Sequence, residues 1–231
     1  MKKIAILQPN YIPWKGYFDL INMVDEFVLY DEMQYTKRDW RNRNRIKTPS
    51  GLQWLTIPVR VKGNFFQKIN QTQISDKNWG KKHWQTIQRN YAKAPFFNDY
   101  REIFEDLYLN CNDTYLSDVN YKFIQAINKI LGIKTVIKWS SDFDLIDGKT
   151  ERLLGICKAC NATIYLSGPS AKTYFNQSLA EKENIQVKWM DYNNYPEYTQ
   201  LHPPFRHNVT ILDLIFNEGP NAAKYMKSLG R

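Results

Sequence analysis

Arginines and asparagines alternate along residues 41–45, directly after a tryptophan. In an extended backbone the three arginines would point to one side and the two asparagines to the other. A row of guanidinium groups suits paired hydrogen bonds to phosphate oxygens, and the indole of Trp40 could stack on a base or a sugar. A solvated basic loop is the alternative. We expect a phosphate-binding segment with these contact residues: Gln34, Trp40, Asn42, Arg43, Arg45 and Lys47.

A second candidate segment is the aromatic, proline-containing run 8–18, which follows the first predicted strand. Ligands of parallel sheets bind beyond the carboxyl ends of the strands, so we expect Gln8, Tyr11 and Trp14 to contact substrate. The alternative is that the aromatic side chains only cover the end of the sheet. The layout is similar to that of nucleotidylyltransferases, but the tetrad 14–17 has aromatic residues where their His-x-Gly-His motif has histidines. This difference argues against nucleotidyl transfer by that mechanism.

A third candidate is Ser167-Gly168-Pro169-Ser170, between a predicted strand and a predicted helix. Backbone amides at the start of a helix, next to small hydroxyl residues, can bind an anion or an acyl group. The segment lacks the Gly-Lys-Ser/Thr ending of a Walker motif. We therefore expect Ser167, Gly168 and Ser170 to contact substrate, with an ordinary strand-to-helix turn as the alternative.

Two residues are candidates for proton transfer. His83 follows two lysines, whose charges would favour the neutral imidazole that a general base needs. Asp31 ends a predicted strand, where a carboxylate can bind ribose hydroxyls or a metal, or cap a turn. His202 and His207 fit loop positions without a metal-ligand pattern, and the Cys157–Cys160 pair fits helix packing. The sequence therefore predicts no metal site.

The elements that would position these residues begin as a parallel α/β unit, with strand, loop, helix and strand in succession. Strands are predicted at 2–7, 26–31, 52–61, 68–74, 135–139, 163–166 and 185–190. Helices are predicted at 16–24, 171–181, 210–216 and 221–228. A further helix, which includes residues 153–160, is predicted with Thr150 as its N-cap. A hairpin turn is expected at Gly63-Asn64. We predict a single α/β domain over 1–231, with a mostly parallel central sheet flanked by helices and a helical insertion at 79–131.

Charge is concentrated in one region of the chain. Residues 33–93 hold 14 lysines and arginines but only Asp39 and Asp76, a net charge of +12 compared with +9 for all 231 residues. Such a region implies an anionic partner: a phosphorylated small molecule, nucleic acid or an acidic membrane surface. The 34 aromatic residues exclude a disordered chain. Three cysteines, and the lack of a signal peptide or a long apolar run, predict a cytoplasmic protein without a transmembrane segment.

Several segments together resemble the WbqC-like family, whose members are encoded among bacterial surface-polysaccharide genes. The resemblance rests on these segments: 6–18, 31–35 continuing into 40–47, 54–59, 165–168 and 211–219. It implies a role in making or decorating surface carbohydrate and an activated sugar as substrate. It implies no particular reaction, cofactor or oligomeric state.

Two function classes follow. The first is a transferase that modifies a nucleotide-activated amino sugar, by acyl or aminoacyl transfer, since the chain lacks a Rossmann fingerprint and paired carboxylates. The second is a nucleic-acid-binding or nucleic-acid-modifying protein that uses the basic, aromatic-rich stretch 33–93. A non-catalytic scaffold on anionic lipid ranks last, because no helix carries a clustered basic face.

Overall fold

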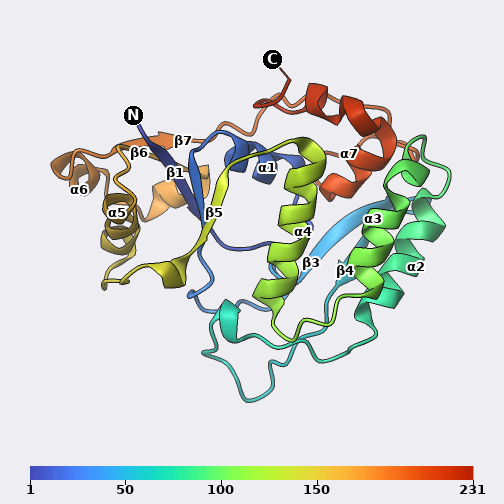
Figure 1. The fold of residues 1–231 in the computed structure, drawn as a ribbon, viewed down its shortest axis with the longest axis horizontal. Coiled ribbons are helices and arrows are strands. Elements are labelled where there is room, and N and C mark those ends of the chain that lie inside the picture. Colours follow the sequence, from blue (N-terminus) through green and yellow to red (C-terminus); the bar gives the residue numbers. More distant parts are fainter. Residues whose placement is uncertain (231) are drawn as a thin grey trace.

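The structure, a computed structural model, describes residues 1–230. Its centre is a five-stranded sheet whose neighbouring strands all run parallel (Figure 1). The strand order is β5-β2-β1-β6-β7, with these bounds: β1 Lys3–Leu7, β2 Glu26–Leu29, β5 Val136–Trp139, β6 Ile164–Ser167 and β7 Gln186–Trp189. From β1 the chain adds β2 and then β5 on one side, and it then adds β6 and β7 on the other side. The topological switch point of the sheet therefore lies between β1 and β6. The predicted α/β class with a parallel sheet is confirmed.

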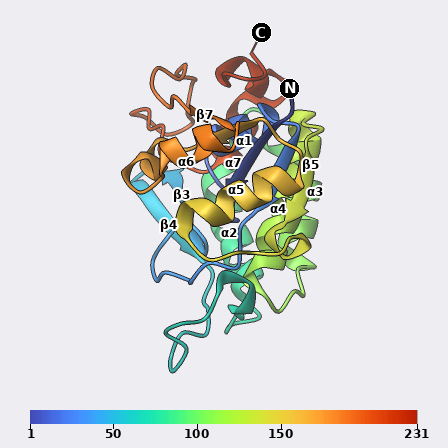
Figure 2. The ribbon, with the colours of Figure 1, turned by 90° about the vertical axis from the view of Figure 1, so that its left-hand side faces the viewer.

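Both faces of the sheet are covered, which explains why its three central strands, β2, β1 and β6, are mostly apolar and buried. Ala5 and Phe27 enter one core, whereas their neighbours Ile4 and Val28 enter a separate core on the other face. The first core is formed with α1 (Lys15–Asn22), α4 (Leu116–Leu131) and α7 (Ile211–Glu218), and the second with α5 (Lys149–Ala159) and α6 (Gln177–Lys182). Figure 2 shows α5 and α6 on their side of the sheet.

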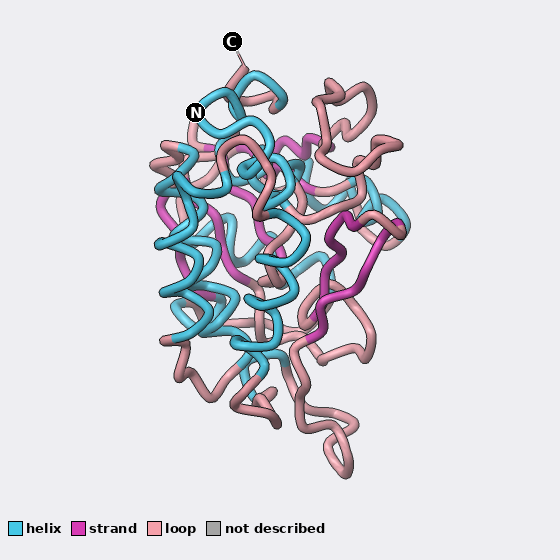
Figure 3. Tube along the Cα trace, turned by 90° about the vertical axis from the view of Figure 1, so that its right-hand side faces the viewer, coloured by secondary structure: helices cyan, strands magenta, loops and turns pink. Residues whose placement is uncertain are grey.

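A two-stranded antiparallel hairpin lies apart from the parallel sheet, beside the helices (Figure 3). It consists of β3 (Arg43–Thr48) and β4 (Gly51–Thr56), and α2 (Trp79–Tyr91) contacts β3. Helix α3 (Phe97–Leu109) packs on α2. The predicted helical stretch 79–131 is thus three helices, and Gly132 ends α4 in the left-handed conformation (φ 70°).

One continuous apolar core joins the sheet, the hairpin and the helices α1 to α4 and α7. On this ground we propose, as the sequence suggested, that the chain forms a single domain. Within residues 1–230, every helix is too short or too polar to cross a membrane.

Some predicted elements are wrong. Residues 68–74 form no strand, because they pair by single bridges with three separate segments and contain the 3₁₀ helix Ile69–Gln71. The hairpin turn is at 48–51 and not at Gly63-Asn64, because the arginine row itself forms the first strand. The predicted helix 171–181 is a 3₁₀ helix, Pro169–Thr173, followed by α6. The predicted helix 221–228 is instead the 3₁₀ helix Gly219–Tyr225.

The predicted cap of α5 is also wrong. Gly148 occupies the N-cap position with φ 95°, and Thr150 lies inside the helix. The Thr150 hydroxyl accepts a hydrogen bond from the backbone N–H of Asn176 (2.9 Å), so it ties α5 to the start of α6.

Candidate functional site

Two arginines of β3 form a cationic surface stacked on tryptophans. The Arg43 guanidinium lies 4.0 Å from the ring centre of Trp54, and Arg45 lies 5.0 Å from Trp54 and 5.4 Å from Trp40. Both tryptophans are about 40% exposed (Trp40 39%, Trp54 40%). Arg41 pairs with Asp39 (3.1 Å), but neither Arg43 nor Arg45 pairs with a carboxylate of residues 1–230. Their Nε atoms are buried without a hydrogen-bond partner in the same range.

Uncompensated, partly buried guanidinium groups favour an anionic ligand. The proximity of Arg43 and the burial of Arg45 lower the pKa of Arg45, with burial the larger cause. Because stacking on flat indole rings holds both groups in place, little side-chain entropy would be lost when a phosphate binds. We refer to Arg43, Arg45, Trp40 and Trp54 as the Arg–Trp surface.

The loop after β1 is fixed in a strained conformation beside this surface. Ile12 has φ 36°, which is rare for a β-branched residue and marks stored backbone strain. The Asn44 amide, projecting from β3, donates to the carbonyl oxygens of Tyr11 (3.1 Å) and Ile12 (2.9 Å). The backbone N–H of Ile211 donates to the carbonyl of Pro13 (2.9 Å). Strain held by such contacts is typical of binding sites.

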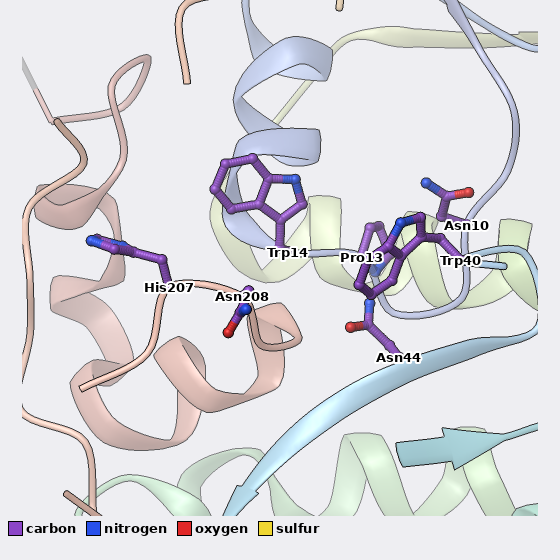
Figure 4. Close-up of a pocket in the computed structure, with 7 residues that line it drawn as sticks. All are labelled: Asn10, Pro13, Trp14, Trp40, Asn44, His207 and Asn208. Atoms are coloured by element: carbon purple, nitrogen blue, oxygen red, sulfur yellow. The ribbon is translucent and has the colours of Figure 1, made fainter. Parts of the chain in front are cut away.

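A cavity of about 280 Å³ opens between this loop, β3 and the segment before α7 (Figure 4). Its walls are the indoles of Trp14 and Trp40 and three side-chain amides, with these lining residues: Asn10, Pro13, Trp14, Trp40, Asn44, His207 and Asn208. The Oδ1 atom of Asn10 is buried and has no hydrogen-bond partner within residues 1–230. We call this space the Trp14–Trp40 cavity.

A buried lysine lies close to the cavity. Lys15, next to Trp14, is only 3% exposed and donates to the carbonyl of Pro196 (2.8 Å), with its ammonium over the rings of Tyr195 and Tyr198. Burial lowers the pKa of Lys15 to about 8. Partial burial, and then the Lys15 charge, lower the pKa of His207. These effects favour the neutral form of the His207 imidazole, which lies at the edge of the cavity.

The segment after β6 is near the cavity residue Trp14, with Tyr192 between them. A side chain at Gly168 would begin 3.9 Å from the Tyr192 hydroxyl, and the Tyr192 ring packs edge-on against Trp14 (5.2 Å between ring centres). Ser167 is buried, whereas Ser170 is exposed in a 3₁₀ helix. The α-helix start that was expected to bind an anion here is absent from the described residues, because α6 begins only at Gln177.

His83 lies inside the protein. Its Nε2–H donates to the carbonyl of Thr56 (3.1 Å), so its Nδ1 accepts from the Tyr11 hydroxyl (2.8 Å), which in turn accepts from Tyr108 (2.9 Å). Burial lowers the pKa of His83 to about 4. Both ring nitrogens are thus engaged, and Tyr11 is fully buried. This arrangement fits a role in positioning the loop after β1 better than contact with a ligand.

Asp31 is also buried, at the carboxyl end of β2. Its carboxylate accepts from the Ser140 hydroxyl (3.2 Å), and burial raises its pKa. It does not line the Trp14–Trp40 cavity. Within residues 1–230 no three His, Cys, Asp or Glu side chains come together as metal ligands.

The other predicted contact residues have structural contacts. Asn42 is buried and donates to the carbonyl of Ile57 (2.8 Å), and Lys47, 2% exposed, partly offsets the burial that raises the pKa of Asp213. Gln34 donates to the carbonyl of Phe65 (2.9 Å). Gln8 lies half-buried on the loop after β1, and its carbonyl accepts from the Tyr17 hydroxyl (3.0 Å).

The structure therefore brings together four of the predicted residues, namely Trp14, Trp40, Arg43 and Arg45. Sequence reasoning missed Asn10, Asn208 and His207 as cavity residues. Asn10 could have been predicted, because it lies three residues after the end of β1. His207 and Asn208 come from a segment far along the chain, and only the packing of the α7 start against β3 (Thr210 N–H to the Arg45 carbonyl, 2.9 Å) brings them to the site.

One comparison with known proteins identifies a family. The model of the WbqC-like protein family matches residues 8–225. A Mycobacterium tuberculosis protein named "Uncharacterized protein Rv1507c" is 51% identical over 227 residues, which cover 98% of each chain. No solved structure matches. The resemblance noted in the sequence is thereby confirmed, and the chain belongs to the WbqC-like protein family.

Proposed function

We propose that this protein is an enzyme of bacterial surface-carbohydrate biosynthesis that binds a nucleotide-activated sugar. The sugar would occupy the Trp14–Trp40 cavity, and the diphosphate would lie on Arg43 and Arg45. The observation that carries the proposal is the double position of Trp40, which lines the cavity and also belongs to the Arg–Trp surface. One ligand with a sugar at one end and phosphates beside it would satisfy both parts.

The chemistry of the cavity supports a sugar. Indole faces pack against the C–H side of a pyranose, and amide side chains can both donate to and accept from hydroxyl groups. The buried, unpartnered Oδ1 of Asn10 is an acceptor of the kind that a sugar hydroxyl or amide would use. A cavity of about 280 Å³ is large enough for one monosaccharide and too small for a whole sugar nucleotide, so the remainder of the ligand would extend over β3.

For the reaction we propose transfer of an acyl or aminoacyl group to the amine of an amino sugar. The amine nitrogen would form a bond to the acyl carbon while the bond between that carbon and the donor's leaving group breaks. His207, whose pKa is lowered, is the cavity residue suited to accept the amine proton. In this proposal His207 takes the role that the sequence suggested for His83.

A thermal-melt panel tests the proposal. It compares nucleoside-diphosphate sugars, including amino sugars, with acyl-coenzyme A, ATP and a short single-stranded oligonucleotide, at low and at moderate salt. A ligand at ~100 times its Kd stabilises the fold by about 2.7 kcal/mol, which shifts the melt clearly. A salt-tolerant shift with a sugar nucleotide is expected. A shift confined to the oligonucleotide and abolished by salt would instead favour the nucleic-acid function.

A further inference from the structure

The loop between β4 and α2 presents two phenylalanines to solvent at its tip. Phe65 is 69% exposed and Phe66 is 82% exposed, more than any other large apolar side chain in residues 2–230. The residues from Lys62 to Phe66 are all exposed. This loop, blue-green in Figure 1 and pink in Figure 3, projects beyond the rest of the molecule at the bottom of both views. Leaving two adjacent phenylalanine rings in water forgoes a large burial free energy, so a contact partner is expected.

The exposure is imposed by the fold. The Gln34 amide donates to the carbonyl of Phe65 (2.9 Å), and the backbone N–H of Tyr35 donates to the carbonyl of Gln67 (2.9 Å). The Gln67 side chain closes the loop by donating to the carbonyl of Arg60 (2.8 Å). The loop is therefore braced from both ends, and its tip displays the two rings in a fixed arrangement.

The chain segment that carries the tip is cationic. No acidic residue occurs between Asp39 and Asp76, and Arg60, Lys62 and Lys68 flank the two rings. Lys68 pairs with Glu32 (3.3 Å) and Arg60 contacts the Gln73 side chain (3.1 Å). Lys62 has no polar partner in the described part of the chain.

We propose that this Phe65–Phe66 tip is a membrane anchor that inserts into the headgroup region of an anionic phospholipid bilayer. The two rings at the tip could enter the apolar boundary of the bilayer, while the flanking cations contact the anionic phosphates above it. The two rings stand edge to face (interplanar angle 89°, centres 5.0 Å apart). In that geometry the edge of one ring covers a face of the other, which leaves fewer open faces for stacking bases and favours a lipid surface over a nucleic acid.

Vesicle co-sedimentation tests this proposal. The probes are vesicles of phosphatidylcholine alone and of equal parts phosphatidylcholine and phosphatidylglycerol. The full chain should sediment with the anionic vesicles. The double variant Phe65→Ser/Phe66→Ser should lower the partition coefficient at least tenfold, and Lys62→Gln, which removes one positive charge, should lower it about fivefold. Circular-dichroism melts confirm that each variant is folded.

The matched control is Ile103→Ser/Leu109→Ser, which removes two exposed apolar side chains of α3 (45% and 46% exposed). It should sediment as the unmodified chain does. Failure of the unmodified chain to bind anionic vesicles would overturn the proposal, and so would binding that the Phe65/Phe66 variant retains in full. Self-association or nucleic-acid binding that depends on Phe65 and Phe66, without vesicle binding, would also overturn it. Sugar-nucleotide binding should be the same in all these variants, so this test is independent of the proposed function.

Discussion

The Asn44 side chain on β3 holds the loop after β1 by donating to the carbonyl oxygens of Tyr11 (3.1 Å) and Ile12 (2.9 Å). Asn44 lies between Arg43 and Arg45, whose side chains form the cationic surface. A single strand therefore supplies the guanidinium groups of the Arg–Trp surface on one face and, on the other, the hydrogen bonds that shape the neighbouring cavity.

Asn44→Ala should destabilise the protein by about 2–4 kcal/mol, because it leaves two buried carbonyl groups without a donor. Urea denaturation measures the change in the free energy of unfolding. The control Asn98→Ala, at an exposed position on α3, should change that free energy by less than about 0.5 kcal/mol. Equal stability of the two variants would show that the Asn44 hydrogen bonds do not hold the loop.

Helices α2 and α3 approach each other closely at Gly80. A Cβ atom there would lie 2.1 Å from the carbonyl oxygen of Tyr108, which is backbone and cannot move aside easily. Gly80→Ala should cost at least about 2 kcal/mol of stability. Gly155→Ala is the matched substitution on α5, where the new Cβ would make an ordinary contact with Ile146 (3.6 Å), and it should stabilise by about 0.5–1 kcal/mol. The prediction fails if the two variants melt alike.

Burial lowers the pKa of His83 to about 4, compared with about 6.5 in the unfolded chain. Between these values the unfolded state binds more protons, so this histidine's contribution to stability is complete above about pH 6.5 and is lost as the pH falls toward 4. Going from about pH 7 to about pH 5 should cost the unmodified protein roughly 2 kcal/mol that His83→Gln does not lose. Urea denaturation of both proteins at the two pH values checks this, and parallel losses would contradict it.

The Tyr91 hydroxyl lies between two buried partners. It donates to the carboxylate of Asp213 (2.7 Å) and accepts from the backbone N–H of Lys47 (2.9 Å). Tyr91→Phe should therefore lower the free energy of unfolding by about 2–4 kcal/mol. Tyr121→Phe, which removes a hydroxyl without a hydrogen-bond partner in residues 1–230, should have little effect. Comparable losses in both variants would indicate a packing effect.

The sequence predicted the parallel sheet well, because each central strand is short, apolar and bounded by breakers. It missed β3, since a strand that alternates arginine and asparagine resembles a solvated loop until the loop after β1 is known to pack on its asparagine face. The side-chain alternation itself was predictable: Asn42 and Asn44 are buried, and Arg43 and Arg45 are half-exposed. The conformation of residues 68–74 depends on tertiary packing, because their bridge partners come from three separate segments.

The candidate site was predictable where it depends on local sequence. Trp14 and Trp40 follow strands or flank the arginine row, and both line the cavity. The surroundings of the histidines were not predictable, because burial depends on distant segments. His83, beside two lysines in sequence, is covered by Tyr11, whereas His207 is carried to the cavity by the segment before α7.

The most direct test of the account is isothermal titration of the nucleoside-diphosphate sugar that gives the largest shift in the melt panel. Arg43→Ala should raise its Kd by roughly 10–100-fold without unfolding the protein, because a charge-assisted phosphate contact is lost. Trp14→Ala should also weaken binding, whereas Arg60→Ala, outside the Arg–Trp surface, should bind normally. If Arg43→Ala binds as tightly as Arg60→Ala, the Arg–Trp surface does not hold the phosphates and the central claim is wrong.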